Sequence, residues 1–242
     1  MSQVRKYMTA VTTTRPRYVA LIPAAGVGAR MQAASPKQYL QVAGKPMLRH
    51  ALDAFLASPW IAHTYVVVSA DDDQIDAVVP ADGVTVLRCG GATRMETILN
   101  ALEVLQGKLN EHDQVLVHDA ARPGLTPALI AKLIMETADH PAGGLLALPV
   151  VDTVKRAGQG SLSAATVPRD GLWLAQTPQM FSYALLRRAL SEAPDPQAIT
   201  DDASAVEALG LSPRLVEGHP RNLKVTLPRD IDAAELYLLH SF

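Results

Sequence analysis

Short apolar runs alternate with amphipathic segments of helical length along this chain, and that alternation limits the folds open to it. The apolar runs are β-branched or continuously apolar and are bounded by Gly, Pro or Asp, which is typical of strands buried on both faces. They span residues 18–23, 64–69, 83–87, 114–118 and 144–149. The helical segments between them span residues 47–57, 72–79, 93–106 and 127–139. This spacing predicts right-handed βαβ units and an α/β fold with a mostly parallel sheet.

The pattern changes after Pro149. Residues from about 150 to 168 are polar, Gly-rich and too irregular for a helix, so we predict a projecting hairpin or arm there. We expect regular structure to resume with strands at 172–175 and 212–217 and helices at 183–191, 201–209 and 228–239. This organisation predicts a flexible extension over residues 1–17 and a single domain over residues 18–242.

Composition excludes several classes of function. The chain has 22 Lys and Arg against 24 Asp and Glu, a net charge of −2, which argues against a general nucleic-acid binder. The single Cys89 can form neither an intramolecular disulfide nor a cysteine zinc cluster, so a reducing compartment is expected. The first 17 residues lack the apolar core of a signal peptide, and no apolar run approaches the length of a membrane-spanning helix. We therefore expect a cytoplasmic protein that binds no membrane.

A glycine-containing loop follows the first predicted strand. Residues 24–31 read AAGVGARM, and Lys37 follows six residues later. Glycines directly after a buried strand allow the backbone to approach an anion and to point N–H groups at it. Met31 is too large for the last position of a dinucleotide-binding fingerprint, and the Gly-Lys-Ser/Thr ending of a Walker loop is absent. The loop is either a phosphate loop of another type, with Arg30 and Lys37 as its cations, or a tight turn with two solvated cations.

Asp119 follows the fourth predicted strand. A carboxylate at the end of a parallel strand can hold Mg²⁺, which takes one or two carboxylates together with substrate phosphates. The alternative is a turn or helix cap. A cationic glycine loop after the first strand, combined with Asp119 after the fourth, favours a metal–nucleotide site. Two neighbours have simpler interpretations: His118 as a packed residue, and Arg94 as either a solvated side chain or a phosphate ligand.

Five further segments occur in the order of a known family. They are HDAARP at 118–123, DTVK at 152–155, LW at 172–173 with QTPQ at 176–179, ITDDAS at 199–204, and VEG at 216–218 with NLKVT at 222–226. Together with the loop that begins at Ala24, they make the chain resemble the 2-C-methyl-D-erythritol 4-phosphate cytidylyltransferases of isoprenoid precursor biosynthesis. The resemblance covers nearly everything from Tyr18 to Leu239.

The resemblance implies a Rossmann-like, three-layer nucleotidyltransferase fold with a projecting β-arm. It implies an enzyme that converts CTP and methylerythritol phosphate to 4-diphosphocytidyl-2-C-methyl-D-erythritol and pyrophosphate, with Mg²⁺ on Asp119. The residues that would bind CTP are Ala24, Ala25, Gly26, Gly91, Ala92, Thr97 and Arg122. Those that would bind methylerythritol phosphate are Thr153, Arg169, Thr177 and Thr200, and those with catalytic roles are Arg30, Lys37, Arg169 and Lys224. Thr153 and Arg169 would act on the substrate of a neighbouring subunit, which implies a homodimer formed by arm exchange.

Three positions depart from the family pattern, and other functions stay open. Ala92 stands where an acidic residue is usual, Thr97 where Ser is usual, and Pro168 where Asp commonly precedes the arginine of the arm. A cytidylyltransferase for another polyol phosphate, such as ribitol 5-phosphate, is the nearest alternative enzyme. A non-catalytic nucleotide-binding protein with the same fold is the alternative of another class.

Overall fold

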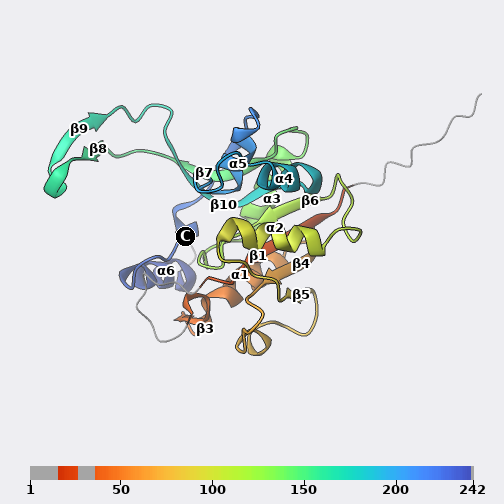
Figure 1. Ribbon diagram of the computed structural model, residues 1–242. Helices are drawn as coiled ribbons and strands as arrows, with labels where there is room; N and C mark the ends of the chain where they lie inside the picture. Colours follow the sequence, from red (N-terminus) through yellow and green to blue (C-terminus); the bar gives the residue numbers. More distant parts are fainter. Residues whose placement is uncertain (1–15, 27–35, 241–242) are drawn as a thin grey trace, which may run out of the picture.

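The computed structural model describes residues 16–26 and 36–240, and its centre is a seven-stranded sheet with the order β11-β7-β10-β6-β1-β4-β5 (Figure 1). The strands are β1 (Tyr18–Pro23), β4 (Ile61–Val67), β5 (Val84–Leu87), β6 (Gln114–Val117), β7 (Gly144–Pro149), β10 (Trp173–Ser182) and β11 (Arg214–Glu217). All neighbours pair in parallel except β10, which runs antiparallel to both β6 and β7. The predicted mostly parallel sheet is confirmed.

Helices cover both faces of this sheet and make three layers. The helices are α1 (Met47–Leu56), α2 (Arg94–Val104), α3 (Pro127–Thr137), α4 (Tyr183–Ser191), α5 (Asp202–Ala208) and α6 (Arg229–Leu239). Alternate residues of a strand point to opposite faces, and β1 shows this directly. Val19 and Leu21 pack with α2, α4 and α5, whereas Ala20 and Ile22 pack with α1 and α3. Burial on both sides explains why the strands are apolar throughout.

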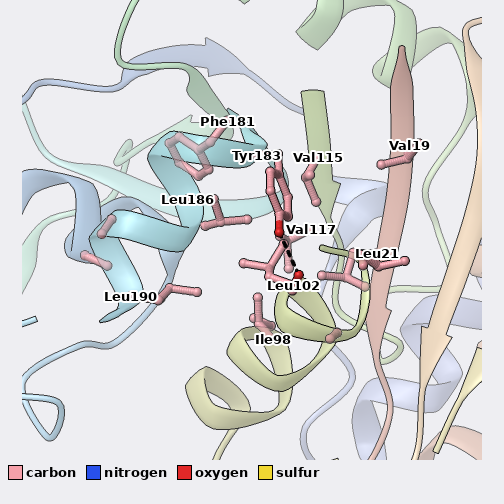
Figure 2. Close-up of a cluster of buried hydrophobic side chains, with 14 of the residues drawn as sticks. Val19, Leu21, Ile98, Leu102, Val115, Val117, Phe181, Tyr183, Leu186 and Leu190 are labelled. Carbon is pink, nitrogen blue, oxygen red and sulfur yellow. Dashed lines mark hydrogen bonds between the residues drawn. The ribbon is translucent and has the colours of Figure 1, made fainter. Parts of the chain in front are cut away.

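Figure 2 shows the layer formed by α2 and α4 against β1 and β6. Ile98 and Leu102 from α2 meet Leu186 and Leu190 from α4 in this cluster. Tyr183, at the start of α4, donates its hydroxyl proton to the Leu102 carbonyl at 2.9 Å. The buried phenol therefore has a partner and fixes α4 against α2.

Two sequence predictions need correction. The helix expected at 72–79 is only a 3₁₀ turn, η3 (Ile75–Ala77), because the Asp72 carboxylate accepts the amides of Gln74 and Ile75 and competes with helical hydrogen bonding. The strand expected at 172–175 is the start of the much longer β10. Its register shifts between Ala175 and Gln179, around Pro178, which has no N–H to donate.

The predicted arm is a two-stranded antiparallel hairpin of β8 (Val154–Ala157) and β9 (Ser163–Val167). Figure 1 shows it projecting well away from the sheet. A second small hairpin, β2 (Gln41–Val42) with β3 (Lys45–Pro46), packs beside α6 and had no counterpart in the sequence prediction. No helix in the described ranges combines the length and hydrophobicity needed to span a membrane. The extension predicted at residues 1–17 falls, up to residue 15, outside the described residues.

An ion pair between a half-exposed arginine and a buried carboxylate lies at the end of the sheet where β6 begins. The Asp113 carboxylate accepts the backbone N–H groups of Arg17 and Asn110 and is 2.6 Å from the Arg17 guanidinium. Burial alone would raise the pKa of Asp113, but the hydrogen bonds from Arg17 and Asn110 outweigh it and lower that pKa below its ordinary value.

This depressed pKa predicts an acid-dependent contribution to stability. The interaction stabilises the fold above the ordinary carboxyl pKa near 4, and the stabilisation is lost as pH falls below it. We expect Asp113→Asn to lower the free energy of unfolding by about 1–2 kcal/mol at pH 7, because Arg17 is half exposed and water screens its share. Urea unfolding at pH 7, 5 and 3 measures this difference. A difference that stays the same at pH 3 would contradict the assignment.

Candidate active site

The loops that leave β1, β4 and β5 are tied together at the carboxyl edge of the sheet. The amide of Ala24 donates to Val67 at 2.7 Å, and the amide of Gly90 donates to Val68 at 2.9 Å. A side chain at Gly90 would overlap the Ala25 Cβ, so only glycine permits this approach. Ligands of open α/β sheets bind at this edge.

A cavity of about 250 Å³ lies where the loop after β6 meets β10. The side chains that line it come from α2, the loops after β6 and β11, β10 and the start of α5. They are Arg94, Asp119, Arg122, Ala175, Gln176, Thr177, Gln179, Thr200, Asp201 and Lys224. The cavity is therefore polar, and its charges come from segments far apart in the sequence.

The Asp119 carboxylate lies at the centre of this charge arrangement. Its Oδ1 accepts from the Arg94 Nε at 3.0 Å, and its Oδ2 is 2.8 Å from the Lys224 Nζ and 3.5 Å from the Arg122 Nε. The side chain is only 9% exposed. Burial would raise the pKa of Asp119, but the positive charges of Arg94, Lys224 and Arg122 outweigh it and hold that pKa far below its ordinary value. Asp119 is an anion at neutral pH.

A hydrogen-bond chain orients the backbone at Asp119. The Thr177 hydroxyl accepts the amide N–H of Asp119 at 3.0 Å and lies 2.9 Å from the His118 Nδ1. Burial lowers the pKa of His118 to about 4, so its ring is neutral near pH 7. The Thr177 proton therefore goes to Nδ1, and the Nε2–H of His118 donates to the Arg122 carbonyl at 3.2 Å. His118 is a packed residue, as predicted.

The segment that carries Lys224 is held against this edge by Arg122. The Arg122 guanidinium donates to the carbonyls of Asn222 and Ala175 at 2.8 and 3.2 Å. Gly124 touches the same segment so closely that a Cβ there would overlap the Arg221 carbonyl oxygen. One residue beyond Lys224, the Val225 carbonyl accepts from the Lys37 Nζ at 2.9 Å. Lys37 and Lys224, which are far apart in the sequence, thus meet at the loop that follows β11.

The structure gathers some of the predicted site residues and separates others. Asp119, Arg122, Thr177, Thr200 and Lys224 all line the cavity. The predicted nucleotide-binding residues Ala24, Ala25 and Gly26 follow β1, while Gly91, Ala92 and Thr97 lie in and after the loop that touches Ala25. Arg30 lies outside the described residues.

Thr153 and Arg169 stand apart from the cavity. Both are exposed and flank the base of the hairpin, Thr153 just before β8 and Arg169 just after β9. The Arg169 guanidinium donates to the Val151 carbonyl. Neither residue lines the cavity of its own chain.

Five residues that line the cavity were not among the predicted site residues: Arg94, Ala175, Gln176, Gln179 and Asp201. The sequence left Arg94 open as a solvated side chain or a phosphate ligand, and it contacts two carboxylates instead. The structure places Arg94 between Asp119 and the start of α5, where it contacts Asp202. Arg94 directly follows Thr93, the N-cap of α2, but no local pattern shows that its side chain reaches two carboxylates.

Comparison with known proteins identifies the family. The family model of 2-C-methyl-D-erythritol 4-phosphate cytidylyltransferase matches residues 18–240. The chain belongs to this family. Its activity is accordingly the transfer of a cytidylyl group from CTP to methylerythritol phosphate, a nucleotidyltransferase reaction of isoprenoid biosynthesis. Enzymes of this family generally use a divalent cation.

Individual relatives match along almost their whole length. The enzyme of that name from Azoarcus sp. (strain BH72) is 50% identical over 226 residues, covering 92% of this chain and 94% of the relative. The enzyme from Ralstonia nicotianae is 52% identical over 238 residues, covering 93% and 94%. A crystal structure of 4-diphosphocytidyl-2C-methyl-D-erythritol synthase has a TM-score of 0.82 at 44% identity, covering 93% of this chain and 100% of that one. The enzyme from Thermus thermophilus has a TM-score of 0.76 at 34% identity, with the same coverage.

The hydrogen-bond chain at Asp119 yields a prediction for Thr177. Thr177→Val keeps the shape of the side chain but leaves the buried Asp119 N–H without its acceptor, at a cost of about 1–3 kcal/mol in unfolding free energy. Turnover falls as well, because Asp119 loses its fixed orientation. Thr177→Ser keeps the hydroxyl and serves as the control. Chemical denaturation and pyrophosphate release measure both effects, and wild-type values for Thr177→Val would refute the role.

Proposed function

We propose that the cytidylyl transfer takes place in the cavity around Asp119, with the two substrates meeting between Lys37 and Lys224. The observation that carries this proposal is the buried Asp119 carboxylate held by Arg94, Arg122 and Lys224. The phosphate of methylerythritol phosphate is mostly dianionic near pH 7, since its second pKa is about 6. It can attack the α-phosphate of CTP without a protein general base.

The obstacle to this reaction is charge, because two anions must meet and more charge develops on the leaving pyrophosphate. Fixed cations around the cavity stabilise that charge by several kcal/mol, and alignment of the attacking oxygen contributes the rest. Lys224, whose side chain is 40% exposed, can turn from Asp119 to a phosphate oxygen. Lys37 and Arg30 are proposed to hold the triphosphate.

The nucleotide is proposed to bind between the loop after β1 and the loop before α2. Ala24, Ala25, Gly26 and Gly91 would line the base and ribose site, together with Ala92, Thr97 and Arg122. The Gly91 amide already donates to the Thr97 hydroxyl at 3.0 Å, and the Ala92 amide donates to the Glu96 carboxylate at 2.8 Å. Side chains of α2 thus hold the loop before α2, and Gly90 of this loop lies against Ala25. Because Ala92 has no acidic side chain, its contribution to base recognition would come from the backbone.

Asp119 fits the divalent cation that this family uses, and we propose that the cation is Mg²⁺. No group of three or more potential His, Cys, Asp or Glu ligands occurs within residues 16–26 and 36–240. Mg²⁺ needs no such group, because one carboxylate oxygen plus substrate phosphates and water suffices. Asp119 Oδ2 can supply that oxygen, since its partly exposed partner Lys224 can exchange it for a phosphate contact. When bound, Mg²⁺ neutralises phosphate charge and polarises the reacting phosphoryl group.

Methylerythritol phosphate is proposed to bind with Thr177, Thr200 and Lys224 of one subunit and Thr153 and Arg169 of another. The length and polar character of the hairpin, and its projection away from the sheet, support a homodimer formed by arm exchange (Figure 1). The single cysteine and the use of CTP support a cytoplasmic location.

Arm exchange predicts complementation between two inactive variants. In the proposed dimer each site takes Lys224 from one subunit and Arg169 from the other. A mixed dimer of Arg169→Ala and Lys224→Ala therefore has one site in which both residues are intact. We expect a mixture of the two proteins, after subunit exchange, to release pyrophosphate when neither does alone. Light scattering provides the control for oligomeric state. A monomer at micromolar concentration, or no recovery in proven mixed dimers, would contradict the exchange.

The substrate assignment is tested by pyrophosphate release with Mg²⁺, crossing CTP and UTP with methylerythritol phosphate and ribitol 5-phosphate. We expect release only with CTP and methylerythritol phosphate. Release with ribitol 5-phosphate would favour the alternative polyol phosphate, and no release from folded protein with any pair would favour a binding protein.

The proposed role of Lys37 predicts a large loss of turnover. We expect Lys37→Ala to lower turnover at least about a hundredfold without unfolding the chain, because a cation on the developing phosphate charge is removed. Lys132→Ala is a matched control, since Lys132 also donates to a backbone carbonyl, that of Glu217 at 2.7 Å, but this carbonyl belongs to β11 and not to the segment of Lys224 that Lys37 contacts. Steady-state kinetics and a thermal melt measure both, and near-normal turnover in folded Lys37→Ala would refute the role.

A further inference from the structure

Arg94 bridges two carboxylates that belong to different elements. Its Nε donates to Asp119 Oδ1 at 3.0 Å, while its two terminal nitrogens donate to the two oxygens of Asp202 at 3.2 and 2.9 Å. The Asp202 side chain is 1% exposed and does not line the main cavity. Arg94 therefore makes its two-point contact with a carboxylate that lies outside the cavity.

Asp202 is held rigidly in place. It lies in the first turn of α5, whose N-cap Asp201 forms a reciprocal capping box with Ser204. The Gln179 side chain from β10 accepts the Ala203 amide at 2.8 Å and donates to Asp201 at 2.8 Å. Both hydrogen bonds fasten the start of α5 to the strand next to β6, so the carboxylate of Asp202 is a fixed anchor.

This anchor decides how Arg94 meets Asp119. A guanidinium and a carboxylate prefer the two-point contact in which both carboxylate oxygens are used. Asp202 takes that contact with the two terminal nitrogens, and Asp119 receives a hydrogen bond from Nε. Without Asp202, Arg94 would be drawn into the two-point contact with Asp119.

We propose that Asp202 is a positioning residue: by holding the terminal nitrogens of Arg94, it fixes the Arg94 Nε on Asp119 Oδ1 and so orients Oδ2, which Lys224 contacts, for the divalent cation. The inference rests on the proposed metal role of Asp119. Asp202 itself touches neither substrate nor cation.

The test is binding of Mn²⁺–CTP to the full chain, followed by the relaxation enhancement of water protons, which needs no turnover. We expect Asp202→Asn to raise the dissociation constant at least about tenfold, a usual size for the loss of a group that orients a metal ligand. Asp113→Asn removes a buried carboxylate of another Asp–Arg pair, at the opposite end of β6, and should leave the constant unchanged. An unchanged constant in folded Asp202→Asn would overturn the inference.

A double-mutant cycle separates positioning from direct attraction between charges. In an Arg94→Gln background, Asp202→Asn should cause little further loss of Mn²⁺–CTP binding, because the residue through which it acts is gone. An equal loss in both backgrounds would overturn the inference.

Arg94→Lys addresses the case in which Asp202→Asn does not fold. It keeps the charge that buried Asp202 requires, but one ammonium group cannot hold both carboxylates in the same way. We expect weaker Mn²⁺–CTP binding at unchanged net charge, and wild-type binding would again overturn the inference. If the wild-type chain itself binds no Mn²⁺–CTP, the proposed metal role of Asp119 fails as well, which distinguishes the two failures.

Discussion

The buried charge of Asp119 is the constraint around which the active edge of this protein is organised. A carboxylate that is removed from water must be paired and hydrogen-bonded, or it costs several kcal/mol. Here the pairing draws in side chains from α2, from the loop after β6 and from the segment before α6. Those elements are far apart in the chain, so satisfying one carboxylate also assembles the walls of the cavity.

The antiparallel strand β10 makes this assembly possible. It enters the sheet between β6 and β7, which places Thr177 beside the His118–Asp119 peptide. From the same strand, Gln179 fastens the start of α5, and α5 supplies the partner of Arg94. A strand that the sequence predicted only at residues 172–175 is thus the element that relates the two sides of the site.

Much of this could be predicted before the structure was known. The strands at 18–23 and 144–149 and the helix at 183–191 have the expected bounds, because continuous apolar runs and the Ser182 cap are signals carried by adjacent residues. Asp119 was predicted from its place after a strand and Lys224 from the family resemblance, and both line the cavity. The false helix at 72–79 shows the limit of this reasoning, since the hydrogen bonds of one aspartate side chain outweighed a weak helical pattern.

Local order of residues was thus enough to establish the α/β class, the projecting hairpin and the family. The tertiary structure was needed to show that Arg94 joins Asp119 to Asp202, that Lys37 meets the loop of Lys224, and that Thr177 uses its hydroxyl to hold Asp119. The physical reason is the range of the interactions. Periodicity, caps and turns depend on residues a few positions apart. Ion pairs across a sheet edge depend on strand order and register, which cannot be deduced from residues that are adjacent in the sequence.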